Sequence, residues 1–322
     1  MEPGERSPGS LHVLLLLPWG GTAGKCVVPF PETTDGFRIV RRLCFSFRGV
    51  FMTRPAVALR ESSLSQHLET IQSQIRRQPA DADLRAQLFQ LMVVQGDWTR
   101  ASEQLKLSAQ LNAQAQPTAM LYEQAIAAER QRERVLSGQE QPAVFGEAPA
   151  WFADLWQALA RDADAPDEAA QLRARAYESA QTSPGVLKIS PDETSAVFEW
   201  ISDGDSRLGP VFEFMSGGRY GWLPFSALRS VRLLPPEGLC DVVWAQAELS
   251  LEDGRTLYGL IPARYPAPAG QSFADQPDGV KLGRMTDWLP LQGDMYAGVG
   301  QKMWMTDQGE YALLDIRSLE MG

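Results

Sequence analysis

The sequence predicts an α+β protein in which a helical N-terminal half precedes a strand-rich C-terminal half. Apolar residues recur with a helical period from Ser63 onward, and the period shifts towards two after Ser183-Pro184-Gly185. Turns rich in Gly and Asp then separate many short strand-like segments. We therefore expect three regions: a leader over residues 1–51, a tetratricopeptide-like helical domain over 52–182 and a β-rich domain over 183–322.

Residues 1–51 differ in composition from the remainder of the chain. They carry six basic and four acidic residues, whereas the whole chain has a net charge of −10. The apolar run Leu11–Leu17 is too short to span a bilayer, which needs about 20 residues. An export signal is the functional alternative, but the residues before the run have two acids and one base, the opposite of the usual bias. We favour Met52 as the natural start, with residues 1–51 as a translated upstream stretch or a disordered tail.

The helical region begins with a single apolar stripe. The stripe consists of Leu64, Leu68, Ile71 and Ile75. Ser62 or Ser63 is a suitable N-cap for this helix, and Pro79 ends it. Asp81 or Asp83 is expected to cap a second helix, which ends near Gly96.

The segment from Gly96 to Asn112 resembles the turn and second helix of a tetratricopeptide repeat. Gly96 supplies the positive φ that a tight turn needs, and the small Ala101 lets two helices approach. Trp98 is expected to wedge between those helices. Further helices are expected over residues 120–135, 151–161 and 167–181. Stacked repeats of this kind offer a concave face to a peptide or helix.

The C-terminal half predicts a compact, barrel-like or open antiparallel sheet. The expected strands cover residues 196–201, 211–214, 220–224, 230–234, 242–251, 257–261, 283–291, 301–305 and 312–316. The turn Glu252-Asp253-Gly254-Arg255 between two of them is a strong hairpin signal.

The residues present argue against several classes of partner and of catalytic or metal site. The charge of −10 and a pI near 4.9 disfavour nucleic acid and anionic membranes as partners. Neither histidine, His12 or His67, has a nucleophile at a known catalytic spacing. The three cysteines form no CxxC pair, and Asp203-Gly204-Asp205-Ser206 begins like a calcium loop but lacks the later ligands. We therefore expect no catalytic residue, no metal and no cofactor.

Two clusters combine arginine with aromatic residues. They are Gly218-Arg219-Tyr220-Gly221-Trp222-Leu223-Pro224 and Gly283-Arg284-Met285-Thr286-Asp287-Trp288. Arginine beside aromatic residues is typical of a binding hot spot. It is equally typical of an arginine stacked on a core tryptophan, so both interpretations stay open.

Several stretches, in order from about Ser63 to Ile316, resemble the ImpE/TagJ (SciE-like) family. In addition to the two clusters they are 128–130, 135–138, 142–151, 205–210, 239–244, 253–254, 261–265 and 300–301. The resemblance implies a helical N-terminal half, a β-containing C-terminal half and no enzymatic residues. It also implies a cytoplasmic accessory role in type VI secretion. Residues 1–51 match nothing in the family pattern, which strengthens the case for Met52.

What the resemblance implies about partners is specific. Family members bind the N-terminal helix of the small contractile-sheath subunit and help couple it to the ATP-driven AAA+ sheath-disassembly machine. We expect an amphipathic partner helix to lie on the helical half or at its junction with the β half. The expected contact residues are Arg219, Tyr220, Trp222, Arg284 and Trp288. The alternatives are an enzyme with perturbed acids beside Arg219 or Arg284, and a generic repeat scaffold unrelated to secretion.

Overall fold

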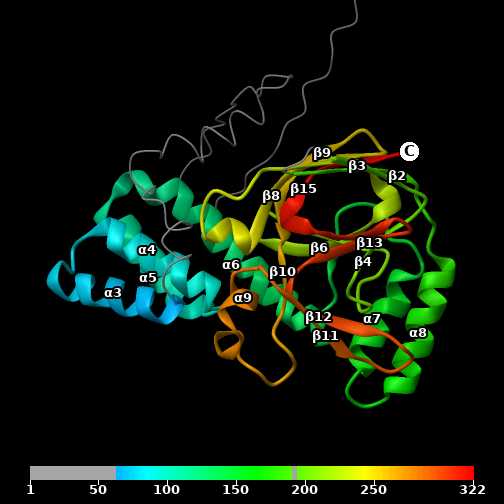
Figure 1. The fold of residues 1–322 in the computed structure, drawn as a ribbon, viewed down its shortest axis with the longest axis horizontal. Coiled ribbons are helices and arrows are strands. Elements are labelled where there is room, and N and C mark those ends of the chain that lie inside the picture. Colours follow the sequence, from blue (N-terminus) through cyan, green and yellow to red (C-terminus); the bar gives the residue numbers. More distant parts are fainter. Residues whose placement is uncertain (1–62, 191–193) are drawn as a thin grey trace, which may run out of the picture.

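The computed structural model describes residues 63–190 and 194–322 of the 322-residue chain. The expected leader and the expected start at Met52 lie outside the described residues. Figure 1 shows an array of helices at one end of the molecule and the sheets at the other, with α6 running between them. The chain is therefore α+β, as the sequence predicts.

Most of the helices belong to the N-terminal half. In chain order they are α3 (Leu64–Arg77), α4 (Ala82–Val94), α5 (Trp98–Leu111), α6 (Gln116–Leu136), α7 (Phe152–Arg161), α8 (Pro166–Ser179) and the short α9 (Asp278–Lys281). In this set, no helix is both long enough and apolar enough to cross a membrane.

The helix boundaries follow local capping chemistry. Ser63 and Gln66 form a capping box at the start of α3, and the Asp81 carboxylate accepts two backbone N–H groups at the start of α4. Gly96 has a φ of 72° in the turn before α5. These caps confirm the predicted boundaries, and consecutive helices from α3 to α6 pack on one another. That they form a tetratricopeptide repeat stays a prediction.

Trp98 contacts α6 and the β half in addition to beginning α5. Its indole N–H donates to the Glu133 carboxylate of α6 at 2.6 Å, and its ring centroid is 5.7 Å from that of Trp244 in the β half. α6 offers the acceptor and β8 (Trp244–Leu251) offers the aromatic surface. Trp98 therefore joins the two halves.

A nine-stranded sheet dominates the C-terminal half. Its strands are β1 (Ala143–Val144), β2 (Gly185–Ile189), β3 (Thr194–Phe198), β5 (Val211–Ser216), β6 (Arg219–Pro224), β7 (Leu228–Leu233), β8 (Trp244–Leu251), β9 (Thr256–Pro262) and β15 (Ile316–Met321). Their order is β1-β6-β5-β9-β8-β7-β15-β2-β3. The sheet is open but mixed, because β1 runs parallel to β6 while the other pairs are antiparallel. A wholly antiparallel sheet is therefore a wrong prediction at this edge.

Two three-stranded sheets pack beside the large one. One contains β10 (Arg264–Tyr265), β12 (Tyr296–Gln301) and β11 (Thr286–Pro290), in that order. The other contains β14 (Gly309–Ala312), β13 (Met303–Thr306) and β4 (Ile201–Asp203). Phe212 and Phe225 lie between the sheets with their ring centroids 5.7 and 5.6 Å from that of Trp304. These aromatic rings fill the space that separates the large sheet from β13.

Several predicted strand boundaries are wrong. The expected strand 196–201 is two strands in different sheets, because Glu199 and Trp200 form a bend between β3 and β4. Residues 283–285 precede β11 rather than belong to it, and expected strand 312–316 is a short 3-10 turn between β14 and β15. Strands β2, β12 and β15 were not expected. β12 is rich in glycine, which conceals its period.

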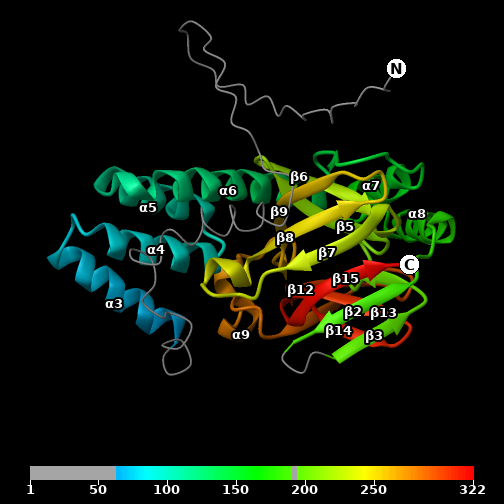
Figure 2. The same cartoon turned by 90° about the horizontal axis from the view of Figure 1, so that it is seen from above.

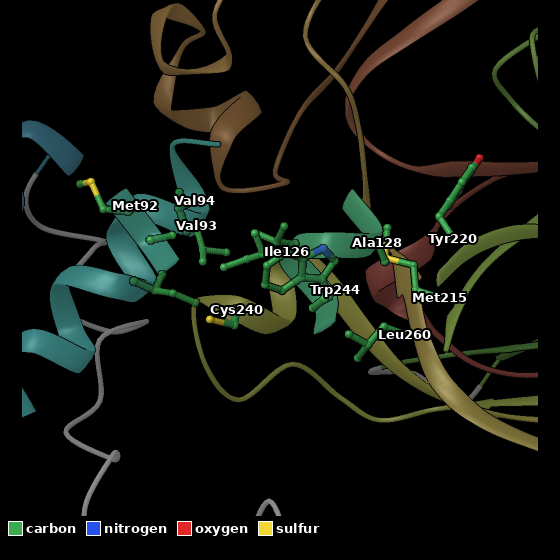
Figure 3. Packing of buried hydrophobic residues seen from close by; sticks show 14 of the residues in the cluster. Met92, Val93, Val94, Ile126, Ala128, Met215, Tyr220, Cys240, Trp244 and Leu260 are labelled. Carbon is green, nitrogen blue, oxygen red and sulfur yellow. The ribbon is translucent and has the colours of Figure 1, made fainter. Parts of the chain in front are cut away.

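The helical and β halves share one hydrophobic core. Phe89 of α4 and Ile126 of α6 belong to the same buried cluster as Trp222 of β6 and Trp244 of β8. Figure 3 shows how this cluster continues, with Met92, Val93 and Val94 at one end, Ile126 and Trp244 in the middle, and Met215 and Leu260 beyond them. Burial of this surface is the main force that holds the halves together.

Candidate functional site

The structure places the five predicted contact residues at two separate locations, on β6 and in the segment from Arg284 to Trp288 of β11. Arg219 is exposed at the start of β6, whereas Tyr220 and Trp222 on the same strand are fully buried. Arg284 is exposed between α9 and β11, and Trp288 is half-buried on β11. Arg219, Arg284 and part of Trp288 are therefore available to a partner, and the five residues do not form one surface.

Tyr220 and Trp222 point into the core because residues two apart on a strand share a face. The Trp222 indole N–H donates to the Tyr220 hydroxyl at 2.8 Å, and that hydroxyl donates to Glu213 Oε1 at 2.6 Å. The Trp222 ring also meets Phe152 of α7 edge-on, at 5.5 Å between centroids. For these two residues the structure favours a role in packing, and their burial rules out direct contact with a partner in this conformation.

Glu213 is the centre of a buried charge network between α6 and the sheets. Arg132 of α6 donates from Nε and Nη2 to both oxygens of Glu213, at 2.7 and 3.1 Å. Lys302 Nζ lies 2.6 Å from Glu213 Oε2 on the other side. The side chains of Arg132, Glu213 and Lys302 are at most 2% exposed. A bidentate contact of this kind fixes both partners in orientation as well as in distance.

The network extends in both directions from this centre. Towards the helices, Glu129 accepts from Arg132 Nη1 at 2.9 Å and from the Trp244 indole at 3.0 Å. Towards the small sheets, Lys302 Nζ lies 2.5 Å from Asp203 Oδ2. The Tyr265 hydroxyl donates to Asp203 Oδ1 at 2.7 Å. The network thus connects α6, β5 and β8 to β10 of one small sheet and to β4 of the other.

The Asp203–Ser206 turn uses its carboxylates for protein contacts rather than for calcium. Asp205 accepts from the guanidinium of Arg207 at 2.6 Å and from the backbone N–H of Gly298 at 3.0 Å. Within residues 63–190 and 194–322, no group of three or more His, Cys, Asp or Glu side chains is arranged to hold a metal ion. The turn therefore links the end of β4 to β12 through hydrogen bonds.

The network shifts the pKa values of its two central acids in opposite directions. Burial by itself would raise the pKa of Glu213, but attraction by Arg132 and Lys302 lowers it below its usual range. Burial raises the pKa of Asp203 to about 6, although Lys302 partly opposes the shift. Lys302 contacts both Asp203 and Glu213, so its positive charge only partly offsets the burial of the Asp203 carboxylate.

The acids with shifted pKa values do not lie where the enzyme alternative places them. The enzyme alternative requires perturbed acids beside Arg219 or Arg284, and instead they lie beside Arg132 and Lys302. Asp203, Glu213 and Lys302 are each at most 4% exposed. The network has the geometry of a structural connection between the halves.

A second buried cation, Arg264, connects the helices to the sheets by a different route. Its Nη1 donates to the carbonyl of Val94 at 2.7 Å and also to the carbonyl of Lys281, so that it caps the C-termini of α4 and α9. The guanidinium lies 4.2 Å from the centroid of the Phe273 ring. No carboxylate in the described part of the chain forms an ion pair with Arg264, and burial lowers its pKa to about 9.

The exposed part of the junction lies where α6 meets the turn between β5 and β6. Gly218 lies against Gln124, because a Cβ on this glycine would be 3.6 Å from Gln124 Cγ. Met120, one helical turn before Gln124, is 60% exposed, and Leu121 is 37% exposed. Arg219 is the next residue after Gly218. We call the surface formed by Met120, Leu121, Gln124 and Arg219 the junction surface.

Sequence reasoning missed the α6 part of this surface. Residues 107–122 contain no charged side chain, although charged residues make up 22% of the chain. A helical surface usually carries charges on its solvent side, so an uncharged run of this length is the signal that would have identified it. The run also leaves Leu107 and Leu111 of α5 exposed at 37% and 44%.

Known proteins resemble this chain in both sequence and fold. The model of the ImpE protein family matches residues 195–320. Over 263 residues, which are 81% of this chain and 89% of the relative, the chain is 42% identical to the type VI secretion system accessory component TagJ of Pseudomonas aeruginosa. The crystal structure of protein VPA1032 from Vibrio parahaemolyticus superposes with a TM-score of 0.72 at 26% identity, covering 84% of this chain and 98% of that one. Sequence and fold together show that this chain belongs to the ImpE/TagJ family.

Proposed function

We propose that this protein is a non-enzymatic, cytoplasmic accessory component of a type VI secretion system. It binds the N-terminal helix of the small contractile-sheath subunit and helps to couple that subunit to the AAA+ ATPase that disassembles the sheath. The observation that carries the proposal is the 42% identity, over most of both chains, to a protein named as a type VI secretion accessory component.

The junction surface supports the part of the proposal that concerns a partner helix. An amphipathic helix needs an apolar surface with polar groups at its border. Met120 and Leu121 supply exposed apolar side chains, and methionine adapts its shape to different partners. Gln124 and Arg219 supply polar groups beside them. Trp222 and Tyr220 hold β6, and therefore Arg219, in a fixed position beside α6.

Arg284 and Trp288 remain proposed contacts at a second location. Trp288 lies over Gly204 and packs against Tyr265 at 5.8 Å between ring centroids, which holds its half-exposed ring in place. Met285 and Leu289 are exposed beside it at 51% and 37%. This second surface is a candidate for contact with another part of the sheath or with the disassembly ATPase.

Titration of the full chain with a peptide that covers the N-terminal helix of the cognate small sheath subunit tests the proposal. We expect saturable binding with a Kd in the micromolar range, that is, about −8 kcal/mol. A peptide whose apolar residues are replaced by glutamine is the negative control. If the folded chain does not bind the helix at several hundred micromolar, the partner assignment is wrong.

Two substitutions then locate the contact. Met120→Glu and Arg219→Ala are each expected to weaken binding about tenfold, because each changes an exposed side chain of the junction surface. Arg229→Ala, which removes an exposed arginine on β7, is the matched control and is expected to have no effect. If all three variants bind the peptide with equal affinity, the helix binds at another surface. That result would not contradict the adaptor function.

A further inference from the structure

The nine-stranded sheet ends in an open edge at β3. β2 pairs with β3 over five consecutive residue pairs, from Gly185–Phe198 to Ile189–Thr194, without a register shift. No strand pairs with the other side of β3 in the described part of the chain. Figure 2 shows β3 as the outermost strand of this side of the sheet. Its outward backbone N–H and C=O groups form a regular row.

Edge strands in soluble proteins are normally protected against pairing with other chains. The other edge strands of the described sheets follow this rule. β1 and β10 are two residues long, β4 ends in Asp203, β11 contains Asp287 and Pro290, and β14 contains Glu310. β3, with the sequence Thr-Ser-Ala-Val-Phe, has no charge, no proline and no bulge. Among residues 63–190 and 194–322, β3 is therefore the edge strand without a charge, a proline, a bulge or a very short length to protect it.

The side chains around this edge are also unusual for a solvent-exposed surface. Val197 on β3 is 67% exposed, and Trp200, two residues after the strand, is 39% exposed. Exposed tryptophan is typical of a binding surface.

Acidic residues follow the Phe198 end of the strand and occur on the β13–β14 hairpin that contacts it. Glu199 follows β3 directly, and its backbone N–H donates to the Asp307 carboxylate at 2.8 Å. Hydrogen bonds from the Gln308 side chain and from this N–H lower the pKa of Asp307, so it stays ionised. Glu310 lies on the same hairpin and is exposed. None of these three acids forms an ion pair with another described residue.

We propose that the β3 edge binds an extended segment of another protein by strand addition, and that this segment carries lysine or arginine next to an uncharged β-forming core. The uncharged strand supplies backbone hydrogen bonds and Val197 supplies an apolar contact. Trp200 and the acids supply a site for a cation, through its attraction both to the carboxylates and to the indole face. The inference is independent of the sheath-helix proposal, because it concerns a different surface.

A second copy of this chain is a poorer occupant of the edge than a basic segment. In the antiparallel pair that a two-fold axis would form, the Phe198 end of each β3 lies beside the Thr194 end of the other, and β3 has no lysine or arginine to offer to the acids. The chain also has a net charge of −10, which opposes self-association. Charge complementarity therefore selects a basic partner.

Two synthetic peptides test the proposal on the full chain. Both have a core of five alternating valine and threonine residues, flanked by paired lysines in one and by paired glutamates in the other. Isothermal titration calorimetry is expected to show at least about tenfold tighter binding of the lysine peptide. The preference is expected to shrink between low and high salt, because screening weakens the exposed charges.

Substitutions confirm the location of the edge. Val197→Lys places a positive charge on the edge and is expected to weaken binding of the lysine peptide at least about tenfold. Val186→Lys is the matched control, because Val186 pairs with Val197 across β2 and β3 but lies one strand inside the edge. The double variant Glu199→Gln/Glu310→Gln removes two acids without changing the strand, and it is expected to reduce the preference for lysine over glutamate.

Three results would overturn the proposal: equal affinity for the two peptides, no effect of Val197→Lys in a folded protein, or a dimer that Val197→Lys dissociates. The last result would assign the edge to a second copy. Light scattering coupled to size-exclusion chromatography distinguishes it. Binding of the sheath helix is expected to be the same in the Val197→Lys variant and in the unchanged chain, so the two proposals fail separately.

Discussion

At the scale of single residues, Glu213 determines how the buried charges are balanced. It accepts from Arg132, Lys302 and Tyr220, so its two oxygens satisfy three donors that are themselves buried. A buried ion pair contributes little net stability compared with apolar packing, because both ions lose their hydration. Removing one member, however, leaves the remaining charges without compensation. The cost of substitution is therefore much larger than the value of the pair.

Glu213→Gln is expected to lower the free energy of unfolding by about 3–5 kcal/mol, because it leaves Arg132 and Lys302 buried beside a neutral amide. Urea denaturation followed by tryptophan fluorescence measures the change. Glu320→Gln is the control: its partner Lys188 is exposed, and the substitution is expected to cost less than about 1 kcal/mol. Similar losses of unfolding free energy in the two variants would contradict the role of Glu213 as the centre of the charge network.

Asp203 gives the stability a pH dependence of defined sign. Burial raises its pKa in the folded protein to about 6, above the value of 3.8 for an ordinary aspartate. The folded state therefore holds this proton more tightly, and the stability from this group is present at low pH and lost as the pH rises through about 6. Glu213 has a lowered pKa, so its contribution has the opposite sign and is lost as the pH falls.

Asp203→Asn isolates the first of these contributions. The stability of the unchanged chain relative to the variant is expected to fall by up to about 3 kcal/mol between pH 4 and pH 7, at about 1.4 kcal/mol per pKa unit. Urea denaturation of both proteins at four pH values measures the difference. A difference that is constant or grows with pH would show that the folded protein does not raise the pKa of Asp203.

At the scale of secondary-structure elements, Arg264 holds helix ends against the small sheet. Its guanidinium caps α4 and α9 at once, so that α4 is fixed to the β half through its last turn. The carbonyl groups at the end of a helix carry a partial negative charge, which a buried cation stabilises. This interaction explains how Arg264 is buried without a carboxylate.

Arg264→Met keeps much of the side-chain volume but removes the caps. We expect faster hydrogen exchange at the C-terminal turn of α4 and in α9, and a loss of about 2–4 kcal/mol in unfolding free energy, because several buried carbonyls lose their donors. Arg255→Met, at an exposed arginine in the β8–β9 turn, is the control. Unchanged exchange in α4 would show that packing alone fixes this helix.

How well the sequence predicts each element depends on how local its determinants are. Ser63, Asp81 and Gly96 act within a few residues of their own positions, so the boundaries of α3 and α4 and the turn before α5 were predicted. β12 was missed because glycines interrupt its alternating pattern: Tyr265 packs over Gly298, and Met285 and Val280 pack over Gly300. β3 and β4 were joined because the bend at Trp200 lacks a glycine or proline signal.

The site shows the same limit more strongly. Arg132 and Glu213 are 81 residues apart, and Lys302 follows 89 residues later, so no spacing in the sequence indicates that they meet. The Arg/aromatic pattern of β6 did not distinguish exposed Arg219 from buried Tyr220 and Trp222. That distinction depends on which face of β6 meets α6, and the fold alone decides it.

At the scale of the whole molecule, the shared core and the charge network make the two halves interdependent. α6 contributes Ile126 to the core and Arg132 to the network, so separation of the halves would expose both. We expect urea to unfold the halves together. Far-ultraviolet circular dichroism follows the helices, and near-ultraviolet circular dichroism follows the buried Trp222, Trp244 and Trp304. If the far-ultraviolet signal changes at a lower urea concentration than the near-ultraviolet signal, the two halves do not unfold as one unit.

The partner helix is proposed to dock where α6 meets the β5–β6 turn. Hydrogen exchange of the full chain, with and without the sheath-helix peptide, tests this docking most directly. We expect slower exchange in residues 116–124 and 216–219 when the peptide is bound, with little change at β3. Binding that protects only other segments, such as α3 or β11, would contradict the proposed docking.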